Sequence, residues 1–293
     1  MQKLSGFVTM LLSSIIIFSV SCNSGPSGEA YTIKMRLNKG DSFHQNTRMT
    51  MQMNTAAMGQ SVDMTMKMDA FVNFEVLNNA SDNKELKMTY TNLHMGMDMG
   101  KMNAANVNTD SIMNVSTQKM VGKSIIMELS AKNEITGVKG FDSLMAGSSS
   151  DEATRQMMEK MFSKDQMNNL FGMMFSMYPD KPVRVGETWT AKTKVNVANI
   201  DMKVNIKYTL VGVKNGMADI DVDGIIDGKG QMAQAGNAID IAMSGNQKGM
   251  ITIKMDDGYL QNGSYKMNIK ADMEMMGQKI PMTMKADYTL SNK

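Results

Sequence analysis

The fold of this chain is indicated most clearly by the stretch Ile251-Thr252-Ile253-Lys254-Met255 and by Asp256-Asp257-Gly258 directly after it. Apolar and polar side chains alternate with a period of two, which is typical of a β-strand with one buried and one wet face. The Asp-Asp-Gly sequence that follows is typical of a tight turn. Together they predict a strand that ends in a hairpin turn.

The same alternation recurs along the chain from Tyr31 onward. Examples are Met49-Thr50-Met51-Gln52-Met53, Met64-Thr65-Met66-Lys67-Met68 and Val204-Asn205-Ile206, and turn signals such as Lys214-Asn215-Gly216 separate the runs. Strands with one apolar and one polar face are typical of antiparallel sheets with a solvated side. We therefore expect a mainly β protein, built as a curved antiparallel sheet or an incomplete β-barrel.

Residues 149–178 depart from this pattern. Ser149 with Glu152, and Ser163 with Gln166, have the spacing of a helix capping box. Apolar residues then recur at helical spacing and would form one apolar face: Met167, Leu170, Phe171, Met174 and Tyr178. The pattern predicts a central helical pair, which would make the class α+β.

These elements suggest how the chain is organised. We expect residues 30–293 to form a single β-rich domain in two halves, 30–145 and 183–293, joined by the helical segment 149–178. The apolar face of the helices would pack most simply against the concave side of the sheet.

The first residues indicate export and anchoring. A lysine at position 3 precedes an apolar stretch, residues 7–18, that is too short to span a bilayer. Small residues then lead to Cys22, the single cysteine of the chain, and the arrangement resembles a lipobox. We expect residues 1–21 to be a signal peptide and Cys22 to be lipidated, with residues 22–29 as a flexible tether. The alternative is an ordinary signal peptide with a cysteine nearby.

Composition and charge restrict the partners. The net charge of +2 falls to +1 when residues 1–21, which carry only Lys3, are removed, so we expect no nucleic-acid binding. A single cysteine allows neither an intrachain disulfide nor a cysteine zinc cluster. The expected partner is a membrane reached through the lipid anchor, in the cell envelope and at the outer membrane.

The segment Tyr178-Pro179-Asp180-Lys181-Pro182-Val183-Arg184-Val185-Gly186-Glu187-Thr188-Trp189 resembles the Pro-x-x-Pro-Val-x-Val-Gly-x-x-Trp signature of an uncharacterised family of Gram-negative envelope lipoproteins. Further traits similar to that family follow the same order, with a hairpin-rich first half and a closing pair of hairpins through 249–255 and 277–290. The resemblance implies a fold type and a compartment, and it implies no activity.

The signature also has a mechanical interpretation. Pro182 would fix the exit of the chain from the helical segment, and Gly186 would permit a turn. Trp189, the only tryptophan, would begin the next strand as a large core anchor.

Methionine is unusually abundant, with 38 residues. One interpretation is a soft-metal site, because thioether sulfur suits Cu(I) and the stretch His94-Met95-Gly96-Met97-Asp98-Met99 carries three sulfurs beside an imidazole. Met273, Met275 and Met276 could form another cluster. The alternative, which the spread of methionine over the whole chain favours, is a flexible filler of the core. A Met-lined concave sheet could also pack around an apolar guest.

An aspartate series suggests a second metal. Asp219, Asp221, Asp223 and Asp227 match early positions of a Ca²⁺ loop, but the twelfth position is Gly230 where a bidentate Glu is expected. The alternative is a strand with a wet acidic face.

His44 and His94 are the only histidines, and no nucleophile elbow accompanies them. We expect no enzyme, no catalytic residues and no cofactor. The first hypothesis is a membrane-anchored envelope lipoprotein that binds an apolar ligand or an envelope protein. The alternative is a Met- and His-rich copper protein, and the third hypothesis is a hydrolase.

Overall fold

The computed structural model describes residues 28–57, 60–80, 83–98, 114, 117–131, 133–145, 172, 175–197, 200–234, 237–275 and 277–292. The expected signal peptide, Cys22 and nearly all of the expected tether therefore lie outside the described residues.

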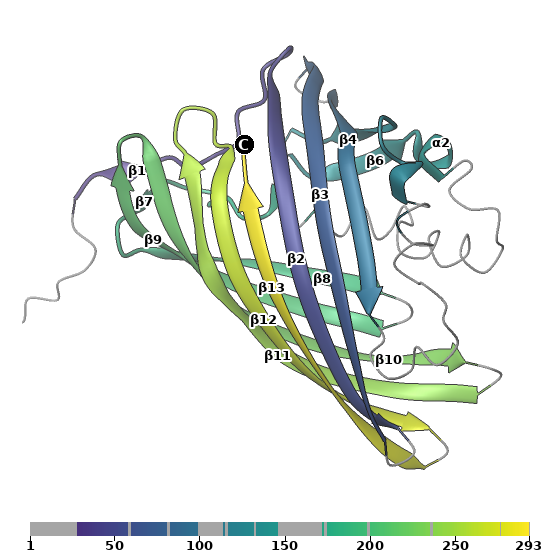
Figure 1. The fold of residues 1–293 in the computed structure, drawn as a ribbon. Helices are drawn as coiled ribbons and strands as arrows, with labels where there is room; N and C mark the ends of the chain where they lie inside the picture. The colour runs from purple at the N-terminus through teal and green to yellow at the C-terminus, as the bar shows by residue number, and fades with distance from the viewer. Residues whose placement is uncertain are drawn as a thin grey trace, which may run out of the picture.

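Strands make up most of the described chain (Figure 1). They are β1 (Ala30–Tyr31), β2 (Ser42–Ala57), β3 (Gln60–Ala80), β4 (Asn83–Asp98), β5 (Ser124–Leu129), β6 (Ile135–Lys139), β7 (Val183–Arg184), β8 (Thr188–Val197), β9 (Ile200–Lys214), β10 (Met217–Gln234), β11 (Asn237–Lys254), β12 (Leu260–Met275) and β13 (Gln278–Ser291). The expectation of a mainly β protein is confirmed.

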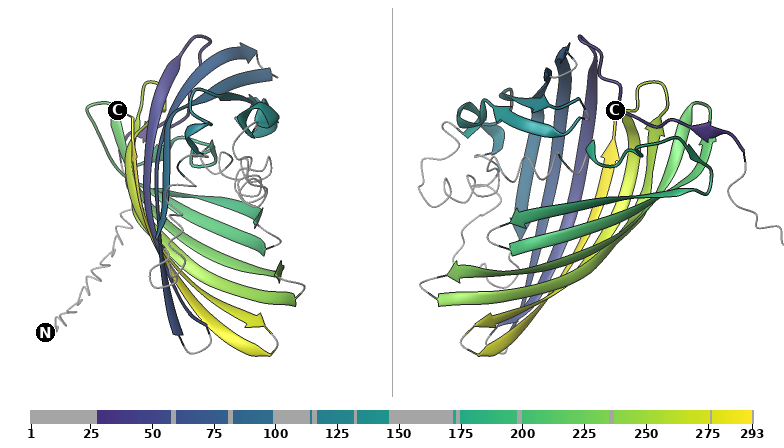
Figure 2. Two further views of the ribbon diagram at one scale, coloured as in Figure 1. Left: turned by 45° about the vertical axis from the view of Figure 1, so that its right-hand side comes forward. Right: turned by 180° about the vertical axis from the view of Figure 1, so that it is seen from behind.

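Eleven of these strands form one antiparallel sheet in the order β6-β5-β4-β3-β2-β13-β12-β11-β10-β9-β8, and β1 pairs with β7 in a separate ribbon. The chain meanders outward from β2 to β6, crosses to β8 at the opposite edge, and meanders back until β13 pairs with β2. The sheet bends so that both of its edges lie on one side, and it remains open between β6 and β8 (Figure 2). The expectation of a curved, unclosed antiparallel sheet is confirmed.

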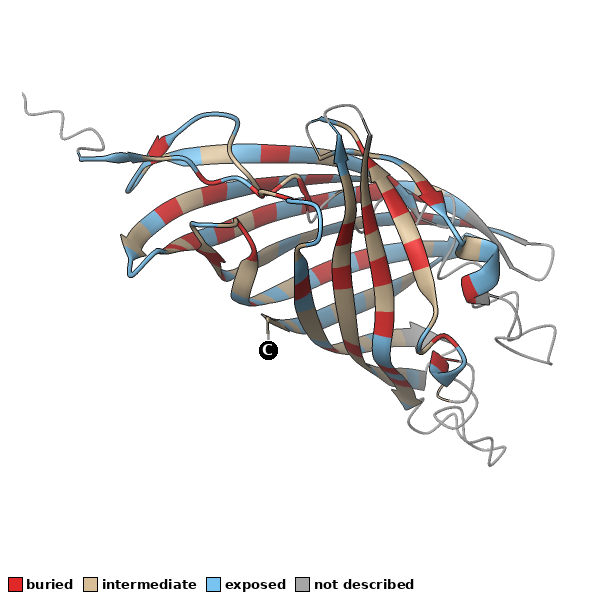
Figure 3. Ribbon diagram, turned by 90° about the horizontal axis from the view of Figure 1, so that it is seen from above, coloured by how far each residue is buried: buried red, intermediate tan, exposed pale blue. Residues whose placement is uncertain are grey.

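The predicted alternation separates two faces of this sheet. In β9 every second residue from Ile200 to Leu210 is buried or half-buried, and most residues between them are exposed. Bands of buried and exposed residues succeed one another along the strands of the sheet (Figure 3). Register extends the first set across the sheet, because Tyr208 pairs with Val222 and Trp189, and Val222 pairs with Gly249. We call the face that carries these residues the inner face.

The inner face is uncharged over a wide area. Within the described residues of β2, β3 and β8–β13, no Asp, Glu, Lys, Arg or His occupies an inner-face position. The charged residues of these strands alternate onto the outer face, where cross-strand ion pairs such as Arg48 with Asp69 form at 3.2 Å. Such pairs are solvent-exposed and contribute little to stability, so burial of the inner face dominates the energetics.

The helical segment differs from expectation. The described part of the chain contains one short helix, α2 (Phe141–Met145), which contacts β5, so a central helical pair is not supported. Residues 149–171, 173 and 174 lie outside the described residues. Of the remainder, Phe175 and Met177 are buried against the two hydrophobic clusters of the sheet.

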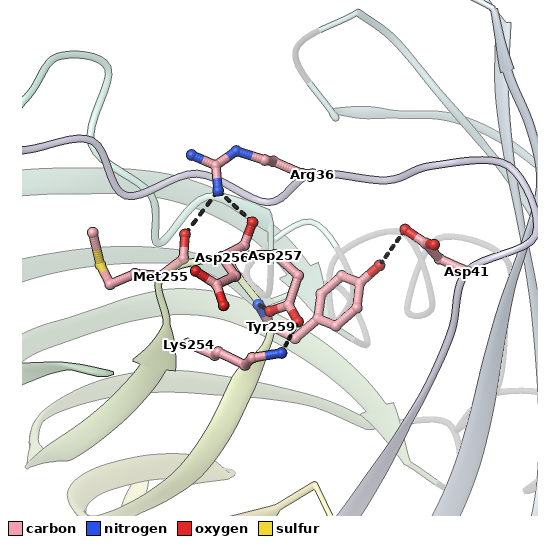
Figure 4. A network of polar contacts seen from close by, with 7 residues as sticks. All are labelled: Arg36, Asp41, Lys254, Met255, Asp256, Asp257 and Tyr259. Carbon is pink, nitrogen blue, oxygen red and sulfur yellow. Dashed lines mark hydrogen bonds and ion pairs between the residues drawn. The ribbon is translucent and has the colours of Figure 1, made fainter. Parts of the chain in front are cut away.

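An extended segment, residues 32–41, fastens one end of the sheet, and we call it the strap (Figure 4). Arg36 donates its backbone N–H to Asp257 O at 2.7 Å, and its Nη1 donates to Met255 O at 2.8 Å and to Asp256 O. The strap crosses the turn between β11 and β12. That turn lies where Asp256-Asp257-Gly258 predicted it.

Glycine is required in that turn. Gly258 has a φ of 78°, in the left-handed region that favours glycine. A Cβ at Gly258 would collide with the backbone of Lys34 and Met35 in the strap. Tyr259, the next residue, stacks on Phe43 with ring centroids 4.2 Å apart and donates from its hydroxyl to Asp41 at 3.3 Å.

Candidate functional site

A cavity of about 290 Å³ lies on the inner face, between the hydrophobic clusters of the two halves of the sheet. We call it the hollow. Strands β2, β3, β4 and β9–β13 line it, together with Met177. Its apolar lining includes Met68, Ala70, Val72, Ile206, Val222 and Leu290. Its volume lies just below the range of about 300–1,000 Å³ that small-molecule sites usually occupy.

Two glycines of β11 allow β11 and β12 to lie close together beside the hollow. Gly249 lies on the inner face, and a Cβ there would meet the backbone of Ser264 and Tyr265 on β12. Gly245, four residues earlier on the same face, would likewise meet Asn268 O and Ile269. The backbones of β11 and β12 can approach each other this closely only because both positions lack a side chain.

Tyrosines form the polar part of the wall. Tyr265 and Tyr288 are cross-strand partners whose rings stack with centroids 4.7 Å apart. Along the same row of the sheet, only Gly249 and Val222 separate Tyr265 from Tyr208. All three tyrosines line the hollow.

The surroundings of these phenols disfavour negative charge. Burial raises the pKa of Tyr208 to about 12. Burial, and then the neighbouring phenols of Tyr288 and Tyr208, holds the pKa of Tyr265 well above its ordinary value. Burial also raises the pKa of Tyr288 and that of Tyr90, a fourth tyrosine in the lining. The hydroxyls therefore remain protonated donors at neutral pH.

Two amides complete the polar lining. Gln45 on β2 and Gln247 on β11 both line the hollow. Gln247 lies over Gly224 of the neighbouring strand, where a Cβ would meet its side chain at 2.6 Å. Thr47 contributes a hydroxyl. No charged side chain is among the described residues that line the hollow.

The signature segment holds one border of the hollow. Trp189 Nε1 donates to Met177 O at 2.9 Å, which fixes Met177 at the lining. Tyr178 donates from its buried hydroxyl to Gly258 O at 2.6 Å and so joins the signature to the turn under the strap. Gly186 has a φ of 86° between β7 and β8. The predicted turn at Gly186 and the predicted strand start at Trp189 are thus confirmed.

The structure separates the expected copper ligands. Met95 and Met97 pair with Met68 and Met66 on the inner face, whereas His94, paired with Asp69, is exposed on the outer face. The expected neighbourhood of imidazole and sulfur does not form, because successive strand residues point to opposite faces. Met99 lies outside the described residues.

Methionines nevertheless gather in rows. The rows Met49–Met68–Met95 and Met51–Met66–Met97 cross strands β2, β3 and β4 on the inner face. Met95 belongs to the hydrophobic cluster of the first half, and Met66, Met68 and Met97 pack against it, as flexible core fillers would. Met273 packs against Ile239 and Ile241 in a small cluster. The side chains of Met275 and Met276, which complete the second expected group, lie outside the description.

The aspartate series lies along a strand. Asp219, Asp221, Asp223 and Asp227 occupy alternate positions on the outer face of β10. Asp219 accepts a hydrogen bond from Thr252 at 2.7 Å, and Asp223 lies 4.0 Å from Lys207. The side chains therefore project in parallel from a strand, as the alternative interpretation predicted, and the structure does not bring them together as Ca²⁺ ligands.

Neither histidine lies in the hollow, where a catalytic role would place it. His44 and His94 are both exposed and lie outside the lining of the hollow. Across the described part of the chain, no three His, Cys, Asp or Glu side chains gather as metal ligands would. Among the same residues, no helix has the length and apolar character needed to cross a membrane.

Sequence reasoning missed the polar residues of the hollow. Gln45, Gln247, Tyr265 and Tyr288 interrupt otherwise apolar inner-face positions, and that interruption is the signal that could have marked them. Their convergence depends on register between strands far apart in sequence, which no local pattern gives.

Comparison with solved structures shows a likeness of fold. The structure of lipid–protein interactions in lipovitellin matches with a TM-score of 0.53 and 8% identity, over 88% of this chain and 25% of that one. This chain thus spans about a quarter of the lipovitellin chain.

Two bacterial proteins match with lower scores. OccK2 (OpdF) of Pseudomonas aeruginosa has a TM-score of 0.22 and 5% identity over 87% of this chain and 99% of its own. An outer-membrane channel from Pseudomonas putida F1 has a TM-score of 0.22 and 8% identity over 88% and 97%. These scores are too low to support a common fold.

No curated protein matches the sequence. A family model matches residues 81–260, which is more than half of the chain. The expectation of an uncharacterised family is therefore confirmed, and the chain belongs to the family of unknown function DUF6263.

Proposed function

We propose that this protein is a non-enzymatic lipoprotein of the cell envelope, held at the outer membrane through Cys22, that binds an apolar ligand in the hollow. The observation that carries the proposal is an uncharged inner face around a cavity of about 290 Å³. The likeness of fold to lipovitellin, in a structure of lipid–protein interactions, agrees with an apolar guest.

The energetics favour a guest. Apolar surface that faces water in the hollow is unfavourable by roughly 25 cal/mol per Å², and a ligand that covers it recovers this free energy. The site is concave and has a few polar groups in a mainly apolar wall, which is the usual form of a small-molecule site. A protein partner would need a broader surface, of about 800 Å² on each side.

A charge placed in the hollow tests the binding proposal. Leu290 of β13 lines the hollow and Thr289, its neighbour, is exposed on the outer face. We expect Leu290→Asp to abolish binding of a fluorescent apolar probe such as N-phenyl-1-naphthylamine, because an unpaired carboxylate in an apolar site is costly. Thr289→Asp adds the same charge to the same strand, opposite Arg48, and should leave binding unchanged. Equal probe binding by both variants would refute the hollow as the site.

Labelling with palmitate in cells tests the anchor. Cys22 is the only cysteine, so Cys22→Ala should remove all label and release the chain from the membrane fraction. A Cys22→Ala protein that still takes up label would contradict the anchoring proposal.

The distance from the anchor to the sheet is limited. The described chain begins at Gly28, whose carbonyl accepts a hydrogen bond from Arg184 Nε at 3.1 Å. The six residue steps from Cys22 to Gly28 span at most roughly 20 Å.

A further inference from the structure

The polar groups of the hollow are available to a ligand. Within the described residues, no hydrogen bond involves the hydroxyl of Tyr208, Tyr265 or Tyr288, or the side-chain amide of Gln45 or Gln247. The residues that carry these groups line the hollow, and their polar atoms are not shut off from solvent. A guest that fills the hollow would displace water from them, so it must replace the lost hydrogen bonds.

The phenols and the amides supply donors from one region of the wall. Tyr265 and Tyr288 stack on each other. Tyr208 lies in the same cross-strand row, and Gly249 and Val222 occupy the two positions between it and Tyr265. A phenol or an amide N–H donates to an oxygen acceptor of the guest. The rest of the lining is mostly apolar and suits a hydrocarbon chain.

Charge decides what kind of acceptor fits. The described lining contains no Lys, Arg or His to pair with an anion. Burial raises the pKa of Tyr90, Tyr208, Tyr265 and Tyr288, which shows that these surroundings oppose a negative charge on an oxygen atom. The same desolvation acts on a guest carboxylate and costs several kcal/mol for an unpaired ion. An ester, alcohol or ketone oxygen escapes this cost.

We propose that the hollow is specific for a neutral lipid, a single acyl or alkyl chain that ends in an uncharged oxygen acceptor held by Tyr208, Tyr265 and Tyr288. This inference rests on the proposed function. It goes further by naming the chemical class of the ligand and by excluding ionised fatty acids, which share the same chain. The volume of the hollow, about 290 Å³, suits one chain better than two.

Competition with a fluorescent probe tests the inference. The full chain carrying Cys22→Ser, which has no acyl group of its own, is loaded with N-phenyl-1-naphthylamine and titrated with hexadecane, methyl palmitate or palmitate at a pH well above the pKa of a fatty acid. We expect methyl palmitate to displace the probe at a concentration about tenfold or more below that of palmitate, a difference of about 1.4 kcal/mol. Lowering the pH through the pKa of palmitate should remove the difference.

Tyrosine variants then test the polar contacts. In Tyr265→Phe and Tyr288→Phe the ring remains and only the hydroxyl is lost, so each should weaken methyl palmitate binding by about two- to tenfold and leave hexadecane unchanged. Tyr31→Phe, outside the lining, is the matched control and should change nothing.

The outcomes separate the two proposals. Palmitate that binds as tightly as its methyl ester at high pH, or an ester affinity unaffected by both Phe variants, would overturn the inference while the hollow still binds apolar ligands. Failure of hexadecane, ester and probe alike to bind would overturn the proposed function itself.

Discussion

At the scale of single residues, Gly249 shows how closely β11 and β12 approach each other beside the hollow. A Cβ there would meet the backbone of Ser264 and Tyr265, so Gly249→Ala must force β11 and β12 apart. We expect the free energy of unfolding to fall by about 1–3 kcal/mol, as for other overpacked sites. Gly212→Ala on β9 is the matched control, because nothing lies within 4 Å of its added Cβ, and it should change stability by less than about 0.5 kcal/mol. Urea unfolding of both variants measures the difference, and equal values would contradict this account.

Single residues also show what sequence could and could not give. The alternating pattern assigned the side chains of β9 to the correct faces, and the same rule, applied strictly to His94 and Met95, would have separated them. The stacking of Tyr265 on Tyr288 could not be predicted, because a one-residue change of register would place them on opposite faces.

At the scale of elements, the strap has no regular secondary structure over residues 32–41 and yet it is firmly held. Its own side chains Ile33, Met35 and Leu37 are buried, and Arg36 donates to carbonyls of the β11–β12 turn. Arg36→Met keeps the length of the side chain and removes these donors, so we expect stability to fall by about 1.5–3 kcal/mol. Hydrogen exchange at the amides around Tyr259 should quicken as the strap loosens.

Lys34→Met is the control for this element. Lys34 is exposed two residues earlier in the same segment, and its replacement also removes one positive charge. We expect hydrogen exchange at the turn to be unchanged in this variant. Faster exchange in both variants would indicate that net charge, and not the hydrogen bonds of Arg36, holds the strap.

At the scale of the whole molecule, the sheet joins segments that the sequence gives no reason to pair. The two halves were expected from the alternating runs on either side of residues 149–178, but the pairing of β13 with β2 makes them one continuous sheet, with Met284 opposite Met53. No turn signal or local pattern marks such a contact, because its partners are separated by most of the chain. The hollow depends on this pairing, since it lies between strands of both halves. The strands and the open, curved sheet could therefore be predicted from the sequence. The hollow could not, because it depends on the pairing of strands from both halves.

The tyrosines of the whole molecule predict alkaline unfolding. Burial is the main cause that raises the pKa of Tyr90, Tyr178, Tyr208, Tyr259, Tyr265 and Tyr288, with Tyr208 reaching about 12. In the unfolded chain each titrates near 10. Above about pH 10 the unfolded state therefore binds fewer protons than the folded state, so the free energy of unfolding falls as pH rises towards the folded-state pKa values. Urea unfolding between about pH 8 and pH 11 should show this decline, and ultraviolet absorbance should show phenolate forming together with unfolding. Tyr208→Phe should reduce the number of protons released on unfolding by up to one, and so make the decline with pH less steep. An unchanged slope would contradict the role given to the burial of Tyr208.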